Sequence, residues 1–161
     1  MAVSKTVDVE TARLAYEAGI KDFGENKVQE LKKKAEVLRE VNWHMIGRLQ
    51  TNKVKDIVGH VYLIHSLDRW NLAEALEHRA ALMNTEVQVL VQVNISGEVQ
   101  KAGIKPSEIN DFLFALERLK HIKVRGFMTM APLVDDPEKT RPIFRELKKI
   151  YDFYLNNGPA N

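Results

Sequence analysis

The sequence contains no cysteine, which excludes disulfide bonds and metal sites built from thiolates. No apolar run approaches the roughly 18 residues that a membrane-spanning helix needs. The N-terminus also lacks the charged start and long apolar segment of a secretory signal. These absences fit a reducing compartment, and we expect a cytoplasmic protein without a membrane interaction.

Other functional classes are excluded by motifs and charge. Neither GxxxxGK followed by Ser or Thr nor GxGxxG occurs, so no phosphate-binding loop is expected. The formal net charge is only +2, which does not indicate a nucleic-acid partner. The histidines show no ligand spacing with carboxylates, and we expect no metal site. These histidines are His44, His60, His65, His78 and His121.

The chain has the size and composition of one globular domain, residues 1–161. Hydrophobic residues make up 45% and charged residues 29%, which is ordinary for such a domain. Apolar runs and helical periodicity alternate along its whole length. Strands are predicted at 1–4, 20–23, 42–47, 61–64, 87–95 and 122–130. Helices are predicted at 7–18, 27–41, 51–58, 68–83, 106–120 and 136–157.

This alternation gives six β-α units in a row, which indicates an α/β fold with a parallel sheet and helices outside it. Two architectures fit the pattern, an open doubly wound sheet and a (β/α)8 barrel. A barrel needs eight units and about 250 residues, so this chain is two units short of one. The lysine run at residues 32–34 is most simply the solvated face of a helix.

Polar side chains follow the first two predicted strands, where such folds collect their chemistry. Lys5 could form an imine with a carbonyl cofactor if partial burial leaves its amine neutral. Taken alone, a solvated surface lysine is the favoured interpretation, since most lysines are exposed. Asn26 has an amide that can bind a phenolic or carbonyl oxygen, although an asparagine in a turn is also common.

The third strand leads into the polar run from His44 to Lys53. His44 and Ile46 should share one strand face, so His44 either points into the barrel or is a core histidine. Residues 50–52 could serve function or simply cap the next helix, and Asp68 could cap the helix after the fourth strand.

The last two strand ends carry a loop and a methionine pair. Residues 94–103 form a polar loop with two glycines, which is either functional or a flexible surface loop. Met128 and Met130 should face the same way. They are either core residues or a platform for a flat aromatic ring.

Six strings in this order resemble the family of pyridoxal 5′-phosphate homeostasis proteins, which look like the barrel domain of alanine racemase without its second domain. The strings are AVSKT at 2–6, DFGEN at 22–26, WHMIGRLQTNK at 43–53, IHSLD at 64–68, VQVNISGEVQKAG at 91–103 and GFMTMAP at 126–132. The resemblance covers nearly the whole chain.

The resemblance implies a (β/α)8 TIM-barrel type fold (PLP fold type III) that holds pyridoxal 5′-phosphate as a Schiff base. By position in AVSKT the Schiff-base lysine would be Lys5, and Asn26 would lie close to the cofactor ring. Lys101 resembles a second lysine that handles the cofactor transiently. Three further residues would face the same mouth of the barrel: His44, Asn94 and Met128.

The implied function is a carrier that buffers free cofactor without robust catalytic turnover, with PLP-dependent apo-enzymes as partners. One alternative is a racemase-type enzyme that uses Lys5 and a partner base. A racemase needs a second acid or base, which in racemases comes from the other domain of a partner subunit, so the carrier is favoured. Another alternative is a truncated remnant that binds nothing.

The chain departs from the family pattern at both ends. It begins within the first strand, and it contains neither the Ser-Met-Gly-Met nor the Val-Arg-Ile-Gly stretch of the last two units. In the family these stretches supply most of the phosphate cradle. We therefore expect a domain truncated at both ends, with unpaired edges at its first and sixth strands. It would be a monomer if complete, and copies would associate if it is truncated.

Overall fold

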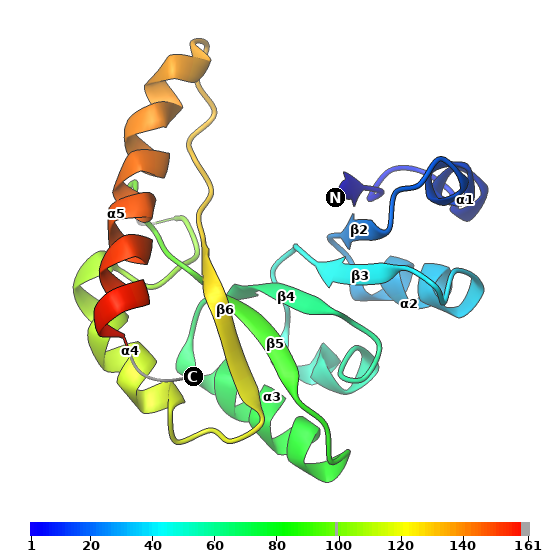
Figure 1. Ribbon diagram of the computed structural model, residues 1–161, viewed down its shortest axis with the longest axis horizontal. Coiled ribbons are helices and arrows are strands. Elements are labelled where there is room, and N and C mark those ends of the chain that lie inside the picture. The colour runs from blue at the N-terminus through cyan, green and yellow to red at the C-terminus, as the bar shows by residue number, and fades with distance from the viewer. Residues whose placement is uncertain (99, 159–161) are drawn as a thin grey trace.

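The computed structural model describes residues 1–98 and 100–158 and contains one parallel sheet with helices outside it (Figure 1). The strands are β1 (Ala2–Val3), β2 (Asp22–Glu25), β3 (Asn42–Met45), β4 (Leu63–Leu67), β5 (Val87–Gln92) and β6 (Ile122–Met128). The α-helices are α1 (Val9–Glu17), α2 (Val28–Val37), α3 (Trp70–Leu82), α4 (Ile109–Leu116) and α5 (Arg141–Asn157). Short 3-10 helices are η1 (Thr51–Asp56), η2 (Pro106–Glu108) and η3 (Pro137–Thr140).

The strands follow one another in the sheet in the order β1-β2-β3-β4-β5-β6, and every pair is parallel. A doubly wound sheet would reverse direction at a switch point, and this order contains no reversal. The sheet is therefore wound like a barrel, and the predicted six-unit α/β fold is confirmed. Within residues 1–98 and 100–158, β1 pairs only with β2 and β6 only with β5, so the sheet is not closed.

Several predicted elements are shorter in the structure. The first strand keeps only Ala2 and Val3, and the segment at 51–58 is a 3-10 helix rather than an α-helix. The predicted strand 87–95 ends at Gln92, because Val93 forms an isolated bridge with Ile104 as the chain folds back. The described part of the chain contains no helix long and apolar enough to cross a membrane.

Of the predicted helix caps, Gln50 occupies the N-cap position of η1, whereas Asp68 does not cap α3. Arg69, not Asp68, is the N-cap of α3, and Gln50 precedes η1; in the described chain neither makes a capping bond through its side chain. The Asp68 carboxylate is instead paired with the guanidinium groups of Arg69 and Arg48. Asp8 does cap α1, since its carboxylate accepts a hydrogen bond from the Thr11 amide at 2.8 Å.

The apolar core lies between the helices and the outer face of the sheet. Along β5 the residues Val87, Val89 and Val91 are buried against the helices, as the period of two in a strand requires. Leu31 and Leu76 are both fully buried on the helix side. The other face of the sheet carries both polar and apolar side chains, and the candidate site lies there.

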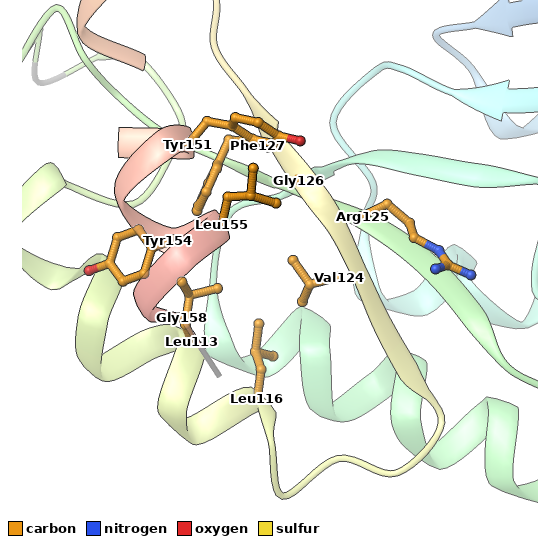
Figure 2. Close-up of a pocket in the computed structure, with 10 residues that line it drawn as sticks. All are labelled: Leu113, Leu116, Val124, Arg125, Gly126, Phe127, Tyr151, Tyr154, Leu155 and Gly158. Carbon is orange, nitrogen blue, oxygen red and sulfur yellow. The ribbon is translucent and has the colours of Figure 1, made fainter. Parts of the chain in front are cut away.

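A small apolar cavity of ≈ 160 Å³ lies between α4, β6 and α5 (Figure 2). Its lining is aliphatic and aromatic, for example Leu113, Phe127 and Tyr154. The one charged residue beside it, Arg125, points away from the other side chains in Figure 2. A binding site for a small polar molecule needs several polar groups aimed inward, so we regard this cavity as a packing gap beside β6.

Candidate functional site

A hollow of ≈ 590 Å³ opens at the carboxyl ends of the strands. This is the face on which barrel enzymes place their chemistry, and the volume suits a small ligand. Five of the six predicted site residues line it: Lys5, Asn26, Asn94, Lys101 and Met128. His44 does not line it, whereas His65 from β4 does. The described residues contain no cluster of His, Asp or Glu side chains suited to a metal ion.

Lys5 follows the end of β1 and points its side chain toward solvent in the hollow. The preceding Ser4 is buried and its amide donates to the Gly24 carbonyl at 3.0 Å, which continues the pairing with β2. The Ser4 carbonyl accepts a hydrogen bond from the Val7 amide at 3.2 Å, so Lys5 lies within a closed turn. Within residues 1–98 and 100–158 the Lys5 amine has no hydrogen-bond or ion-pair partner.

Asn26 comes directly after β2, and its backbone is held against the end of β3. The Ile46 amide donates to the Glu25 carbonyl at 2.9 Å, which brings the two strand ends together. A Cβ atom on Gly47 would lie 2.2 Å from the Asn26 carbonyl oxygen, so only glycine permits this approach. The site therefore depends on a glycine for which sequence pattern alone gave no role.

His44 lies one layer deeper than the hollow, in a chain of polar groups. Its Nε2 is 3.1 Å from Asp22 Oδ1, and its Nδ1 is 2.9 Å from His65 Nε2. A carboxylate only accepts hydrogen bonds, so His44 Nε2–H donates to Asp22. In the neutral His44 ring Nδ1 is then an acceptor, and His65 Nε2–H donates a hydrogen bond to it. This arrangement leaves Nδ1 of His65 as an unprotonated acceptor.

The surroundings of His65 favour its neutral form. Burial, with a smaller contribution from His44, lowers the pKa of His65 from 6.5 to about 4. The hydrogen bonds from His44 and Asn42 lower the pKa of Asp22 below its usual 3.8. At neutral pH this series of hydrogen-bonded groups therefore contains a charged Asp22 and a neutral His65 ring, which lies at the wall of the hollow.

Asn94 organises the loop that follows β5. Its amide nitrogen donates to the Glu98 carbonyl at 2.9 Å, and its Oδ1 accepts from the Gly97 amide at 3.1 Å. Gly103 has a φ of 129°, and a Cβ there would lie 2.6 Å from the Asn94 amide nitrogen. These bonds connect the Asn94 side chain to Gly97 and Glu98, and a functional role for the loop stays a prediction.

Lys101 lines the hollow from that loop, but its amine is already engaged. Lys101 Nζ lies 2.5 Å from Glu98 Oε1. The neighbouring Lys101 ammonium lowers the pKa of the Glu98 carboxyl below its ordinary 4.5, so this ion pair persists at neutral pH. Lys101 would have to leave Glu98 before its amine could react.

The methionine pair and two unpredicted polar residues complete the lining. Met128 and Met130 both line the hollow, as their alternate positions indicate. Arg48 and Gln92 also line it; Gln92 Nε2 donates to the Ala102 carbonyl at 3.0 Å. The polar positions of Val-Gln-Val-Leu-Val-Gln could have identified Gln92, because they occupy the face opposite the buried valines.

The fold and the position of this hollow define a barrel domain of the alanine racemase type. The family model described as "Alanine racemase, N-terminal domain" matches residues 1–159. The alanine racemase of Clostridium difficile 630 superimposes with a TM-score of 0.81 over 99% of this chain and 43% of its own. The identity is only 15%, so that likeness concerns the fold.

Much higher identity links the chain to proteins named pyridoxal phosphate homeostasis protein. The one from Aquifex aeolicus is 47% identical over 155 residues, which cover 94% of this chain and 68% of that protein. The one from Synechocystis sp. is 38% identical over 153 residues, covering 93% and 70%. The chain therefore belongs to the alanine racemase N-terminal domain family and, within it, to the pyridoxal phosphate homeostasis proteins.

A solved relative contains the cofactor. The structure of PipY from Synechococcus elongatus PCC7942 with PLP bound superimposes with a TM-score of 0.89 at 33% identity. It covers 99% of this chain and 75% of PipY.

Proposed function

We propose that this chain binds pyridoxal 5′-phosphate at Lys5 and acts as a carrier or buffer of the cofactor. The observation that supports this most directly is the position of Lys5, an unpartnered amine within the described chain, on the wall of a ≈ 590 Å³ hollow at the strand ends. The cofactor supplies an aldehyde, which joins a lysine amine reversibly as a Schiff base with loss of water. The relatives' names and the PLP-bound PipY structure support the same ligand.

The residues around Lys5 suit the chemical parts of this ligand. Asn26 carries an amide that can donate to a ring oxygen, and the unprotonated Nδ1 of His65 can accept a hydrogen bond. Met128 and Met130 offer apolar, polarizable surfaces for a flat aromatic ring. Arg48 brings a positive charge that can face a phosphate. Its side chain is 68% exposed, and its Nε lies 3.4 Å from Asp68 Oδ2.

We further propose that the chain carries the cofactor without robust turnover. A racemase needs a pair of groups that give and take a proton on opposite faces of the ring. In the hollow, His65 has a pKa of about 4 and cannot supply a proton at neutral pH, and Lys101 is held by Glu98. The partners would be PLP-dependent apo-enzymes in the cytoplasm that accept the cofactor from this chain.

The test is titration of the purified chain with pyridoxal phosphate, followed by borohydride reduction and peptide mass mapping. We expect one reduced adduct, on Lys5, which disappears in Lys5→Ala and persists in Lys101→Ala. Lys105→Ala is the matched control, because Lys105 follows the same loop and is exposed. An adduct distributed over several surface lysines, or none at any concentration, would contradict the proposal.

Two further assays separate the alternatives. Interconversion of L- and D-alanine that depends on Lys5 would favour the racemase-type enzyme over the carrier. Transfer of the bound cofactor to a PLP-dependent apo-enzyme, measured as recovery of that enzyme's activity, should be faster than release into buffer. Equal rates would argue against a direct hand-over.

A further inference from the structure

Another lysine, Lys34 of α2, is buried. Its side chain is 5% exposed and that of Glu25 is 1% exposed. Lys34 Nζ donates to Glu25 Oε1 at 2.5 Å and to the Ser4 carbonyl at 2.7 Å. The Ser4 hydroxyl donates to the same Glu25 oxygen at 2.8 Å. Three side chains thus form one buried polar cluster, the Ser4–Glu25–Lys34 cluster; Ser4 directly follows β1, Glu25 ends β2 and Lys34 belongs to α2.

Stability alone is a weak explanation for this cluster. Removing two charges from water costs several kcal/mol per ion, and an apolar pair of similar volume often stabilises a protein equally well or better. Glu25 Oε2 is buried and has no hydrogen-bond partner among the described residues, which adds to the cost. What the charges provide, and an apolar pair could not, is directed hydrogen bonds to particular atoms.

These hydrogen bonds hold Ser4 and Glu25, which directly precede the two proposed cofactor residues, Lys5 and Asn26. The Ser4 carbonyl accepts from Lys34 Nζ and also from the Val7 amide, and the turn that this second bond closes contains Lys5. On the other side, Glu25 is directly followed by Asn26. β1 has only two residues and a single neighbour in the described sheet, so strand pairing alone gives Lys5 little support.

We infer that Lys34 and Glu25 are positioning residues, which fix the turn of Lys5 and the start of the Asn26 loop so that both face the hollow. This inference rests on the proposed role of Lys5 in binding the cofactor. Lys34 is not itself a candidate for the Schiff base, because its amine is buried and already donates two hydrogen bonds.

The experiment compares Lys34→Met with the double variant Glu25→Gln/Lys34→Met. The single variant leaves the Glu25 carboxylate buried without a cation and is expected to be strongly destabilised. The double variant removes both charges at similar volume and should unfold in urea near the midpoint of the parent. Lys33→Met is the matched control, since Lys33 is the adjacent residue of α2 and its side chain is 75% exposed.

Two readouts are taken on the double variant, whose parental urea midpoint excludes a global loss of stability as their cause. Hydrogen exchange of the Val7 amide reports the turn without any cofactor and should become at least tenfold faster. The dissociation constant of the Lys5 adduct should rise at least tenfold, with a weaker circular dichroism band of the bound cofactor. Lys33→Met should leave both readouts at parental values.

The outcomes separate the two proposals. Parental exchange at Val7 and parental affinity in the double variant would overturn the positioning role. A parent that forms no adduct would overturn the proposed function, and the exchange rate at Val7 would still decide whether Lys34 fixes the turn. Faster exchange with unchanged affinity would also overturn the inference, because the turn would then not govern binding.

Discussion

Protonation of His65 should make the folded state less stable as the pH falls below about 6.5. In the folded chain burial lowers the pKa of His65 from 6.5 to about 4. Between these two values the unfolded chain binds a proton that the folded chain does not, so acid favours unfolding. The loss starts near pH 6.5 and is complete near pH 4, below which both states are protonated.

The size of the effect follows from the two pKa values. A difference from 6.5 to about 4 corresponds to at most about 3 kcal/mol at 1.36 kcal/mol per pKa unit. His65 is only partly buried, and solvent screening reduces this to on the order of 1–2 kcal/mol. Four carboxyl groups have a lowered pKa, namely Asp8, Asp22, Glu98 and Glu138. Their ordinary pKa values are 3.8 for aspartate and 4.5 for glutamate, so they respond outside the upper part of this window.

The assay is urea unfolding from pH 7.5 to 4.5 for the parent and for His65→Gln. The glutamine stays neutral and can still donate to His44 Nδ1, so the variant should lose less stability across this range than the parent. His60→Gln is the control, because His60 is exposed. Identical pH profiles for the parent and His65→Gln, or an NMR titration of His65 centred near 6.5, would refute the reasoning.

Three further substitutions test the packing around the hollow. Gly47→Ala should lower the thermal midpoint and weaken cofactor binding, because the new Cβ would lie 2.2 Å from the Asn26 carbonyl oxygen; unchanged binding would contradict the close approach. Leu76→Ala, at a fully buried position, should cost roughly 2–5 kcal/mol in urea unfolding, and a much smaller loss would argue against that packing. Asn94→Ala should speed proteolysis of its loop, since both ends of its amide hold that loop; an unchanged cleavage rate would refute this.

The order of strands and helices could be predicted because hydrophobic period and chain order are local properties. The depth at which each histidine lies could not be predicted, because it depends on the register between neighbouring strands. β3 and β4 pair with His44 opposite Leu63. His65 is therefore two residues nearer the carboxyl edge than His44 and reaches the hollow. Both histidines point to the same face, and only the register decides which of them lines the site.

The burial of Lys34 was also missed, although the sequence contained a signal for it. The run Lys32 to Lys34 was interpreted as a solvated face, and only Lys32 and Lys33 are exposed. Leu31, Lys34 and Leu38 are spaced by three and four residues, so Lys34 shares the buried face of α2 with two leucines. What the sequence could not supply was the partner, because Glu25 lies on a strand nine residues away.

The buried polar residues gather near the strand ends, and some of them share a face with the apolar core. Seven are buried, namely Ser4, Glu25, Lys34, His44, Ser66, Asp68 and Gln92, and all come from the strand ends of β1 to β5 or from α2. Each makes a hydrogen bond or ion pair, as buried polar groups must; Ser66, for example, donates to the Gly47 carbonyl at 2.7 Å. These bonds hold the backbone that surrounds the hollow.

The position of these hydrogen bonds near the strand ends predicts that stability and cofactor binding can be changed independently. Ser66→Ala loses one buried hydrogen bond, which costs about 1 kcal/mol. It should nevertheless weaken cofactor binding, because it releases the Gly47 backbone that packs against Asn26. Ala80→Gly in the outer layer should cost a similar free energy of unfolding, since it lies inside α3, and leave binding unchanged. Equal losses of affinity in both variants would mean that cofactor binding responds to global stability rather than to the hydrogen bonds of the buried polar residues.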